Sequence, residues 1–152
     1  MYAFALLIGI IAGLRTMTAP TAIGWAAWSG RLDLDGGWLA LLGYSWTPWI
    51  FTLLALGELV GDQLPSTPSR TVPMQFGARI LSGAICGAAV GAPHHAMLGG
   101  LLAGVVGAVI GTLGGHALRL RLAALFKKDP PAAFVEDAIA IGGAWLIFQN
   151  LS

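Results

Sequence analysis

The segment of residues 97–125 constrains the fold of this chain more than any other stretch. Residues 97–115 carry no charged side chain, and glycines recur there every three or four positions. A helix that crosses a bilayer needs about 20 predominantly apolar residues, and small residues at this spacing let helices pack closely in lipid. The segment therefore predicts a transmembrane helix in close contact with its neighbours. Its basic end, residues 116–128, is too polar for hydrocarbon and is expected to project into water.

The composition of the whole chain favours the same environment. Of its 152 residues, 57% are hydrophobic and only 10% are charged, whereas an ordinary soluble domain has roughly a quarter charged residues. Too few charges are present to cover a soluble surface, and a net charge of +1 provides no basic surface for nucleic acid. We therefore predict one transmembrane domain, residues 1–152, with the lipid bilayer as its main partner.

The apolar segments predict an all-α integral membrane bundle of about five transmembrane helices, with four or six as the alternatives. The expected spans are residues 2–28, 38–62, 75–92, 97–125 and 133–148. The first helix is expected to be broken or kinked near Thr18 and Ala19, because Pro20 removes a backbone donor and disfavours helical geometry in the residue before it. The second is interrupted at Pro48, so it either kinks there or begins at Thr47.

Basic residues near the span ends indicate how the bundle is oriented, because cytoplasmic loops of membrane proteins carry an excess of Lys and Arg. The loops after the second and fourth spans, with the adjoining span ends, carry Arg70, Arg79, Arg119, Arg121, Lys127 and Lys128. The opposite side carries only Arg31. We therefore expect the N-terminus and both basic loops in the cytoplasm, and the C-terminus outside.

Charged residues inside the spans are the main functional candidates. Arg15 follows the first apolar run, roughly 20 Å along its helix at 1.5 Å per residue. A charge at this depth costs about 2.5–3.5 kcal/mol on insertion scales, so it needs a partner or a water-filled cavity. Glu58, one turn deeper than Asp62 at the end of the second span, is the expected partner of Arg15. Arg79 and the pair Glu136–Asp137 open later spans and favour interfacial anchoring.

Together these residues predict a polar cavity that is open to the cytoplasm. The candidate ion or substrate pathway comprises Arg15, Thr16, Thr18, Glu58, Asp62, Arg70, Glu136 and Asp137. One carboxylate there could carry a proton or a cation. The alternative is a set of ion pairs that fix helix register, and the two interpretations weigh equally for Glu58 and Asp62. A catalytic group, a metal site and a cofactor site are not predicted, because adjacent His94 and His95 do not face one metal and the glycine runs lack a phosphate-loop pattern.

Two motifs are similar to those of a known family. The chain reads Gly13-Leu14-Arg15-Thr16-Met17-Thr18-Ala19-Pro20, and later Glu58-Leu59-Val60-Gly61-Asp62-Gln63-Leu64-Pro65-Ser66-Thr67-Pro68-Ser69-Arg70. It resembles the small bacterial membrane proteins grouped as domain of unknown function 4126, in which Gly-Leu-Arg-Ser/Thr precedes a proline and Glu-Leu-x-x-Asp-x-x-Pro-x-Thr-Pro-x-Arg follows. The resemblance implies a bacterial inner-membrane protein and brings no assigned activity. A weaker likeness joins Glu58, Gly61 and Asp62 to the Glu-x-Gly-Asp motif of cation/proton exchangers, at a spacing one residue longer.

Three functions are compatible with this pattern. The first is a small transporter or channel for an ion or small solute, because broken helices with polar groups at depth are typical of secondary transporter sites. The second is a structural or accessory subunit of a larger membrane complex, with an unknown membrane partner. A lipid-headgroup enzyme ranks last, because no nucleophile, base and stabiliser stand at a recognisable spacing. The glycine-rich helices are expected to offer a face for a homodimer.

Overall fold

The computed structural model describes residues 1–34, 37–61, 72–127 and 129–151, and within these ranges every regular element is a helix. The elements are α1 (Tyr2–Leu14), α2 (Thr18–Trp28), the 3-10 helix η1 (Trp38–Gly43), α3 (Thr47–Gly61), α4 (Pro73–Gly91), the 3-10 helix η2 (Ala92–His94), α5 (Met97–Phe126) and α6 (Asp129–Asn150). The all-α class predicted from the apolar segments is confirmed.

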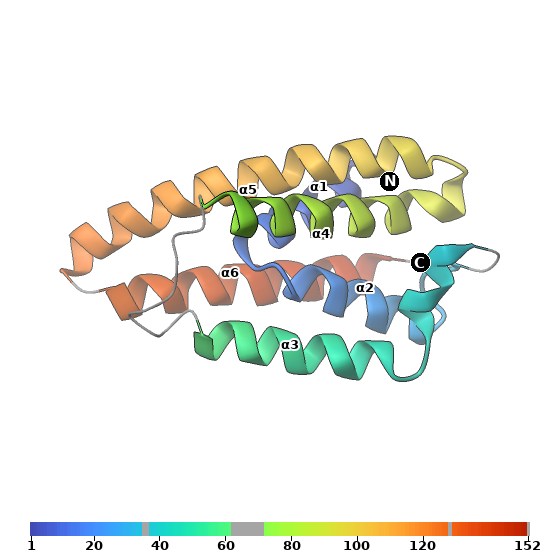
Figure 1. Cartoon of the computed structure of the whole chain (residues 1–152), viewed down its shortest axis with the longest axis horizontal. Coiled ribbons are helices and arrows are strands. Elements are labelled where there is room, and N and C mark those ends of the chain that lie inside the picture. The colour runs from blue at the N-terminus through green and yellow to red at the C-terminus, as the bar shows by residue number, and fades with distance from the viewer. Residues whose placement is uncertain (35–36, 62–71, 128, 152) are drawn as a thin grey trace.

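The long helices have the dimensions of a membrane bundle. Among the described residues, three segments are long and apolar enough to cross a membrane by length and composition: Pro73–His94, Met97–Phe126 and Pro131–Asn150. The apolar helix α3 is shorter, with 15 residues that rise about 22 Å. It begins at Thr47, after η1, so the interruption expected around Pro48 separates two elements. Figure 1 shows that α3, α4, α5 and α6 run in alternating directions along the bundle.

The helices α1 and α2 form a hairpin, and this differs from the single kinked crossing expected for residues 2–28. At the start of α1, Tyr2 packs against Gly99 near the beginning of α5. At its end, Gly13 lies against Ala108 and Thr112, farther along α5. The chain then reverses, and α2 returns to the end of the bundle from which α1 started (Figure 1). The first helix is therefore broken, as expected, but the hairpin does not cross the bundle.

The reversal changes the expected position of the N-terminus. Arg31, just beyond α2, lies at the C-terminal end of α6, where its Nη1 donates a 3.4 Å hydrogen bond to the carbonyl of Gln149. The N- and C-termini thus share one end of the bundle, and Lys127 lies at the other (Figure 1). The prediction that the N-terminus lies on the same side as the basic loops is wrong, because it counted α1 and α2 as one crossing.

Close packing of glycines explains how α5 holds α1 and α4 on either side of it. A side-chain carbon on Gly9 would overlap the backbone of Gly104, and one on Gly104 would overlap the backbone of Gly83. Gly87 meets the backbones of Gly100 and Gly104 in the same way. These glycines of α4 and α5 are therefore occupied within one chain, whereas Gly77 and Gly114 have no atom within 4 Å of an added side-chain carbon. A homodimer through the glycine-rich helices stays a prediction.

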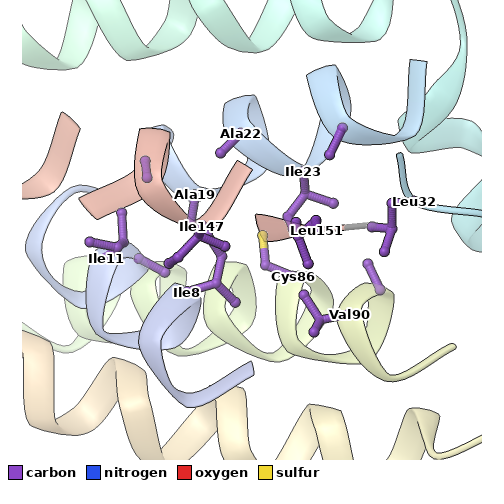
Figure 2. Close-up of a cluster of buried hydrophobic side chains, with 14 of the residues drawn as sticks. Ile8, Ile11, Ala19, Ala22, Ile23, Leu32, Cys86, Val90, Ile147 and Leu151 are labelled. Atoms are coloured by element: carbon purple, nitrogen blue, oxygen red, sulfur yellow. The ribbon is translucent and has the colours of Figure 1, made fainter. Parts of the chain in front are cut away.

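A buried apolar cluster fills the space between the hairpin and its neighbours. Figure 2 shows Ile8 of α1 and Ile23 of α2 facing Cys86 and Val90 of α4, with Ile147 of α6 among them. Ile8, Ile23 and Cys86 have no exposed surface. This cluster lies between the hairpin tip and the end of the bundle that carries the termini. It fixes the hairpin against α4 and α6 and so positions the tip.

Candidate functional site at the hairpin tip

The tip of the hairpin is the short break between α1 and α2, at Arg15, Thr16 and Met17. Arg15 has an extended backbone, with φ −139° and ψ 114°, and α2 begins at Thr18. Pro20 lies in the first turn of α2, where the missing N–H needs no helical partner, so the proline starts a helix instead of kinking one. The break leaves carbonyls of α1 and N–H groups of α2 without helical partners. Inside a membrane, the protein itself must satisfy them.

The carbonyls at the end of α1 are bound by α4 and α5. The Arg79 Nη1 atom donates to the carbonyl oxygens of Gly13 and Leu14 at 2.9 and 2.8 Å. The hydroxyl of Thr112 donates to its own helix at Ala108, at 2.7 Å, and also lies 3.3 Å from the Gly13 oxygen. A guanidinium group is favourable at this position, because the C-terminus of a helix carries partial negative charge.

The N–H groups before α2 are bound by α3. The two carboxylate oxygens of Glu58 accept hydrogen bonds from the backbone N–H groups of Thr16 and Met17, both at 2.8 Å. The negative charge complements the partial positive charge of the helix N-terminus. From α4, the hydroxyl of Ser82 donates to the Thr16 carbonyl at 2.7 Å. Helices α3, α4 and α5 therefore each hold the backbone of the tip.

The side chain of Arg15 points into the bundle and pairs with α6. Its Nε donates to Asp137 Oδ1 at 2.7 Å, and its Nη2 forms an ion pair with the same oxygen. Arg15 is fully buried. A longer ion pair, 3.8 Å between Arg79 Nη2 and Glu58 Oε1, joins the groups that bind the two halves of the tip. The tip is thus held by four charged side chains: Arg15, Glu58, Arg79 and Asp137.

The charges lie well inside the bundle. Arg79 is about 9 Å along α4 from Pro73, and Asp137 is about 12 Å along α6 from Asp129, at 1.5 Å per residue. Arg79 and Glu136 are each 1% exposed. Arg79 and Asp137 thus bind the tip from inside the bundle, while their anchoring at the membrane interface stays a prediction. Helices α4 and α6 begin two and four residues before the predicted spans, at Pro73 and Asp129.

The predicted pathway residues separate into four groups, and Glu136 of α6, which is 1% exposed, forms one of them alone. The structure brings Arg15, Thr16, Glu58 and Asp137 into the tip, but Arg15 pairs with Asp137 and not with Glu58 as expected. Thr18 begins α2 and lines an apolar groove. Asp62 and Arg70 lie outside the described residues.

Sequence reasoning missed three contributors to the tip: the central position of Arg79, and the hydroxyls of Ser82 and Thr112. Two signals could have indicated them. Arg79 and Ser82 are three residues apart and so share one helix face. Thr112 is a hydroxyl within a charge-free, glycine-rich segment, where a polar group in lipid needs a partner.

These features define an all-helical polytopic membrane protein whose first two helices enter the bundle and turn back within it, held by buried charges. Among the residues that the structure describes, no three His, Cys, Asp or Glu side chains form a group that could hold a metal ion. The chain belongs to the family described as Domain of unknown function (DUF4126), which matches residues 2–150. The family membership implied by the two sequence motifs is thereby confirmed.

A more distant similarity covers only part of the chain. Over 85 residues, the chain is 31% identical to Protoheme IX farnesyltransferase 1 from Mesorhizobium japonicum. The alignment covers 54% of this chain and 27% of that protein, so the chain spans about a quarter of the length of the curated relative that it matches. No solved structure matches the chain.

Proposed function

We propose that the protein moves a proton or another small cation across the bacterial inner membrane, with the hairpin tip as its binding site. The observation that carries the proposal is the meeting of two short helices, of 13 and 11 residues, at a buried, charged break. Secondary transporters bind their substrates and coupling ions at such interrupted helices, near the middle of the bilayer. Intramembrane ionisable groups mark ion pathways in many membrane proteins.

The ionisable groups at the tip favour a proton or a cation over an anion. The set comprises the carboxylates of Glu58 and Asp137 and the guanidinium groups of Arg15 and Arg79. Carboxylates within a membrane bundle can take up a proton or bind a cation, whereas an arginine guanidinium stays protonated.

Glu58 is the most exposed of these four side chains. It is 14% exposed, against 11% for Asp137, 1% for Arg79 and 0% for Arg15. Glu58 sits near the end of α3 and holds both N–H groups of the tip. Neutralising its carboxylate weakens these two bonds and the ion pair with Arg79, because bonds to a charged group are about twice as strong as neutral ones. Ion binding and release of the tip from α3 are thus coupled.

Flux through reconstituted protein tests this function. Purified protein in liposomes should dissipate an imposed pH or cation gradient, followed with a trapped pH-sensitive or ion-sensitive dye. Glu58→Gln should abolish the flux while the protein stays monodisperse and helical. Arg121→Gln is the matched control, since Arg121 is exposed near the far end of α5. Folded wild-type protein that carries neither protons nor any cation in a mono- and divalent panel would overturn the proposal.

A structural or accessory role is the second candidate, and one observation favours it. The hydrogen bonds of Arg79, Glu58 and Ser82 go to the backbone of the tip, which they hold in place. Under this alternative, Glu58→Gln lowers the unfolding temperature or prevents purification, the wild type shows no flux, and a membrane partner co-purifies. A lipid-directed enzyme is ranked third. The farnesyltransferase similarity is what supports it, and the match covers 27% of that protein.

The proposal includes an orientation. The far end of α5 carries Arg119, Arg121 and Lys127, so we place it in the cytoplasm by the positive-inside rule. The hairpin then enters from the outer side, together with both termini, and its tip approaches the cytoplasmic half. Glu58 is correspondingly reached from the cytoplasm.

A further inference from the structure

An apolar groove runs between α2, α3 and α6, separate from the charged tip. It encloses a cavity of about 500 Å³, and apolar and aromatic side chains make most of its walls. Helix α3 packs mainly on α2 and η1, which leaves its other flank facing α6 across this groove. The volume falls within the range of about 300–1,000 Å³ that is typical of sites for small apolar ligands.

The groove opens sideways, toward the surroundings of the bundle. Leu56 of α3 and Trp145 of α6 line it on opposite sides and are 53% and 58% exposed. In a membrane-spanning bundle, these surfaces face lipid and not water. The molecules that can enter from this side are therefore the hydrocarbon chains of lipids, or a helix of another protein.

The groove has the direction and the depth of a lipid chain in one leaflet. On α2 it extends from Thr18 to Trp25, and on α6 from Ile141 to Phe148. Each of these stretches rises about 10 Å along the bundle axis, and one leaflet of hydrocarbon is about 15 Å deep, half of a 30 Å core. A hydrogen bond of 3.1 Å from Trp25 Nε1 to Thr52 Oγ1 marks the end nearer the chain termini.

That end of the groove has the chemistry of a phospholipid headgroup site. The exposed guanidinium of Arg31 lies 5.0 Å from the ring centre of Phe148, which lines the groove. Trp25 packs edge-on against Trp28 and Trp49, with ring centres 5.4 and 5.1 Å away. Tryptophans gather at the membrane–water interface, and arginine pairs with phosphate oxygens.

We propose that this groove binds one acyl chain of a phospholipid from the leaflet that contains both chain termini, with the lipid phosphate on Arg31. The chain runs inward between Trp145 and Ala55 and ends beside Thr18, one residue beyond the hairpin tip. The bound acyl chain fills the space between α3 and α6 and packs against both helices. This site is independent of ion transport at the tip.

Native mass spectrometry of detergent-purified protein, reconstituted with phosphatidylglycerol, tests the proposal. The wild type should retain one phospholipid. Ala55→Phe fills the groove and should lose it, whereas Leu53→Phe, at a position on α3 that does not line the groove, should not. Arg31→Gln should weaken retention by about fivefold, the effect of one cation near a lipid surface. Arg121→Gln, at the opposite end, should leave retention unchanged.

The results distinguish the two molecules that could fill this groove, a lipid chain and a second copy of the protein. Equal retention by Ala55→Phe and wild type would overturn the proposal. So would wild type that retains no lipid and forms a dimer that Ala55→Phe dissociates, because a second copy then covers the groove. If Ala55→Phe does not fold, the smaller Ala55→Leu and the exposed Arg31→Gln give the same test.

Discussion

Replacing Asp137 with alanine tests the account of the tip most directly. The substitution removes the carboxylate that Arg15 contacts through Nε, at 2.7 Å, and through Nη2. The Arg15 side chain is 0% exposed, so its charge cannot move into water without displacing the tip. Breaking a buried ion pair by removing one partner costs about 3–5 kcal/mol. At about 2–4 °C per kcal/mol for a chain of this size, the unfolding temperature should fall by roughly 6–20 °C.

Thermal unfolding in detergent, followed by circular dichroism, measures this shift. Arg121→Ala is the control, because Arg121 is an exposed charged residue near the end of α5. The double variant Arg15→Met with Asp137→Leu removes both charges. It therefore shows whether the loss of stability comes from the missing attraction or from leaving the charge of Arg15 buried without Asp137. Replacing both members of a buried pair with apolar residues is often neutral, so the double variant should recover about half of the loss or more.

Two results would refute this reasoning. If Asp137→Ala shifts the unfolding temperature no more than Arg121→Ala, Arg15 does not depend on Asp137. If the double variant is as unstable as Asp137→Ala alone, the cost comes from the lost contact of the two helices and not from the buried charge.

The remaining predictions concern packing and topology. Gly104→Ala should lower the unfolding temperature, because its side chain would meet the backbone of Gly83 and overpacking costs about 1–3 kcal/mol; Gly114→Ala, with no atom within 4 Å of the new carbon, should not, and equal shifts would contradict the packing. In a Cys86→Ser background, a thiol at Ala3 should react with an impermeant maleimide from the side opposite to a thiol at Lys127. Labelling of both from one side would rule out the hairpin.

The sequence was informative about the environment of the chain and about where its helices break. The charge-free residues 97–115, and the proline after Arg15, are local features whose cost in lipid can be judged without knowing the fold. The reversal of the chain could not be predicted in this way. A kinked crossing and a hairpin contain the same two apolar runs with the same polar residues between them. What separates them is packing at a distance, such as Tyr2 against Gly99 and Arg31 against the end of α6.

The pairing of the charged residues at the tip could not be predicted from the sequence either. Arg15 was expected to meet Glu58, because both stand at the end of an apolar run and carry opposite charges. In the structure, Glu58 binds the backbone of the tip and Asp137 takes the side chain of Arg15. A broken helix needs ligands for its N–H groups and its carbonyls as well as for its charges. Counting charges alone finds the members of such a cluster but not their pairing.

The pairing of Arg15 with Asp137 also determines when, during synthesis, the hairpin of α1 and α2 can reach its final position in the bundle. The two residues are 122 positions apart, and ribosomes add about 5–20 residues per second, so Asp137 emerges roughly 6–24 s after Arg15. Glu58 and Arg79 are made in between. The first two helices to leave the ribosome are thus among the last to reach their final depth. Until α6 is inserted, the Arg15 guanidinium lacks the carboxylate with which it pairs in the finished bundle.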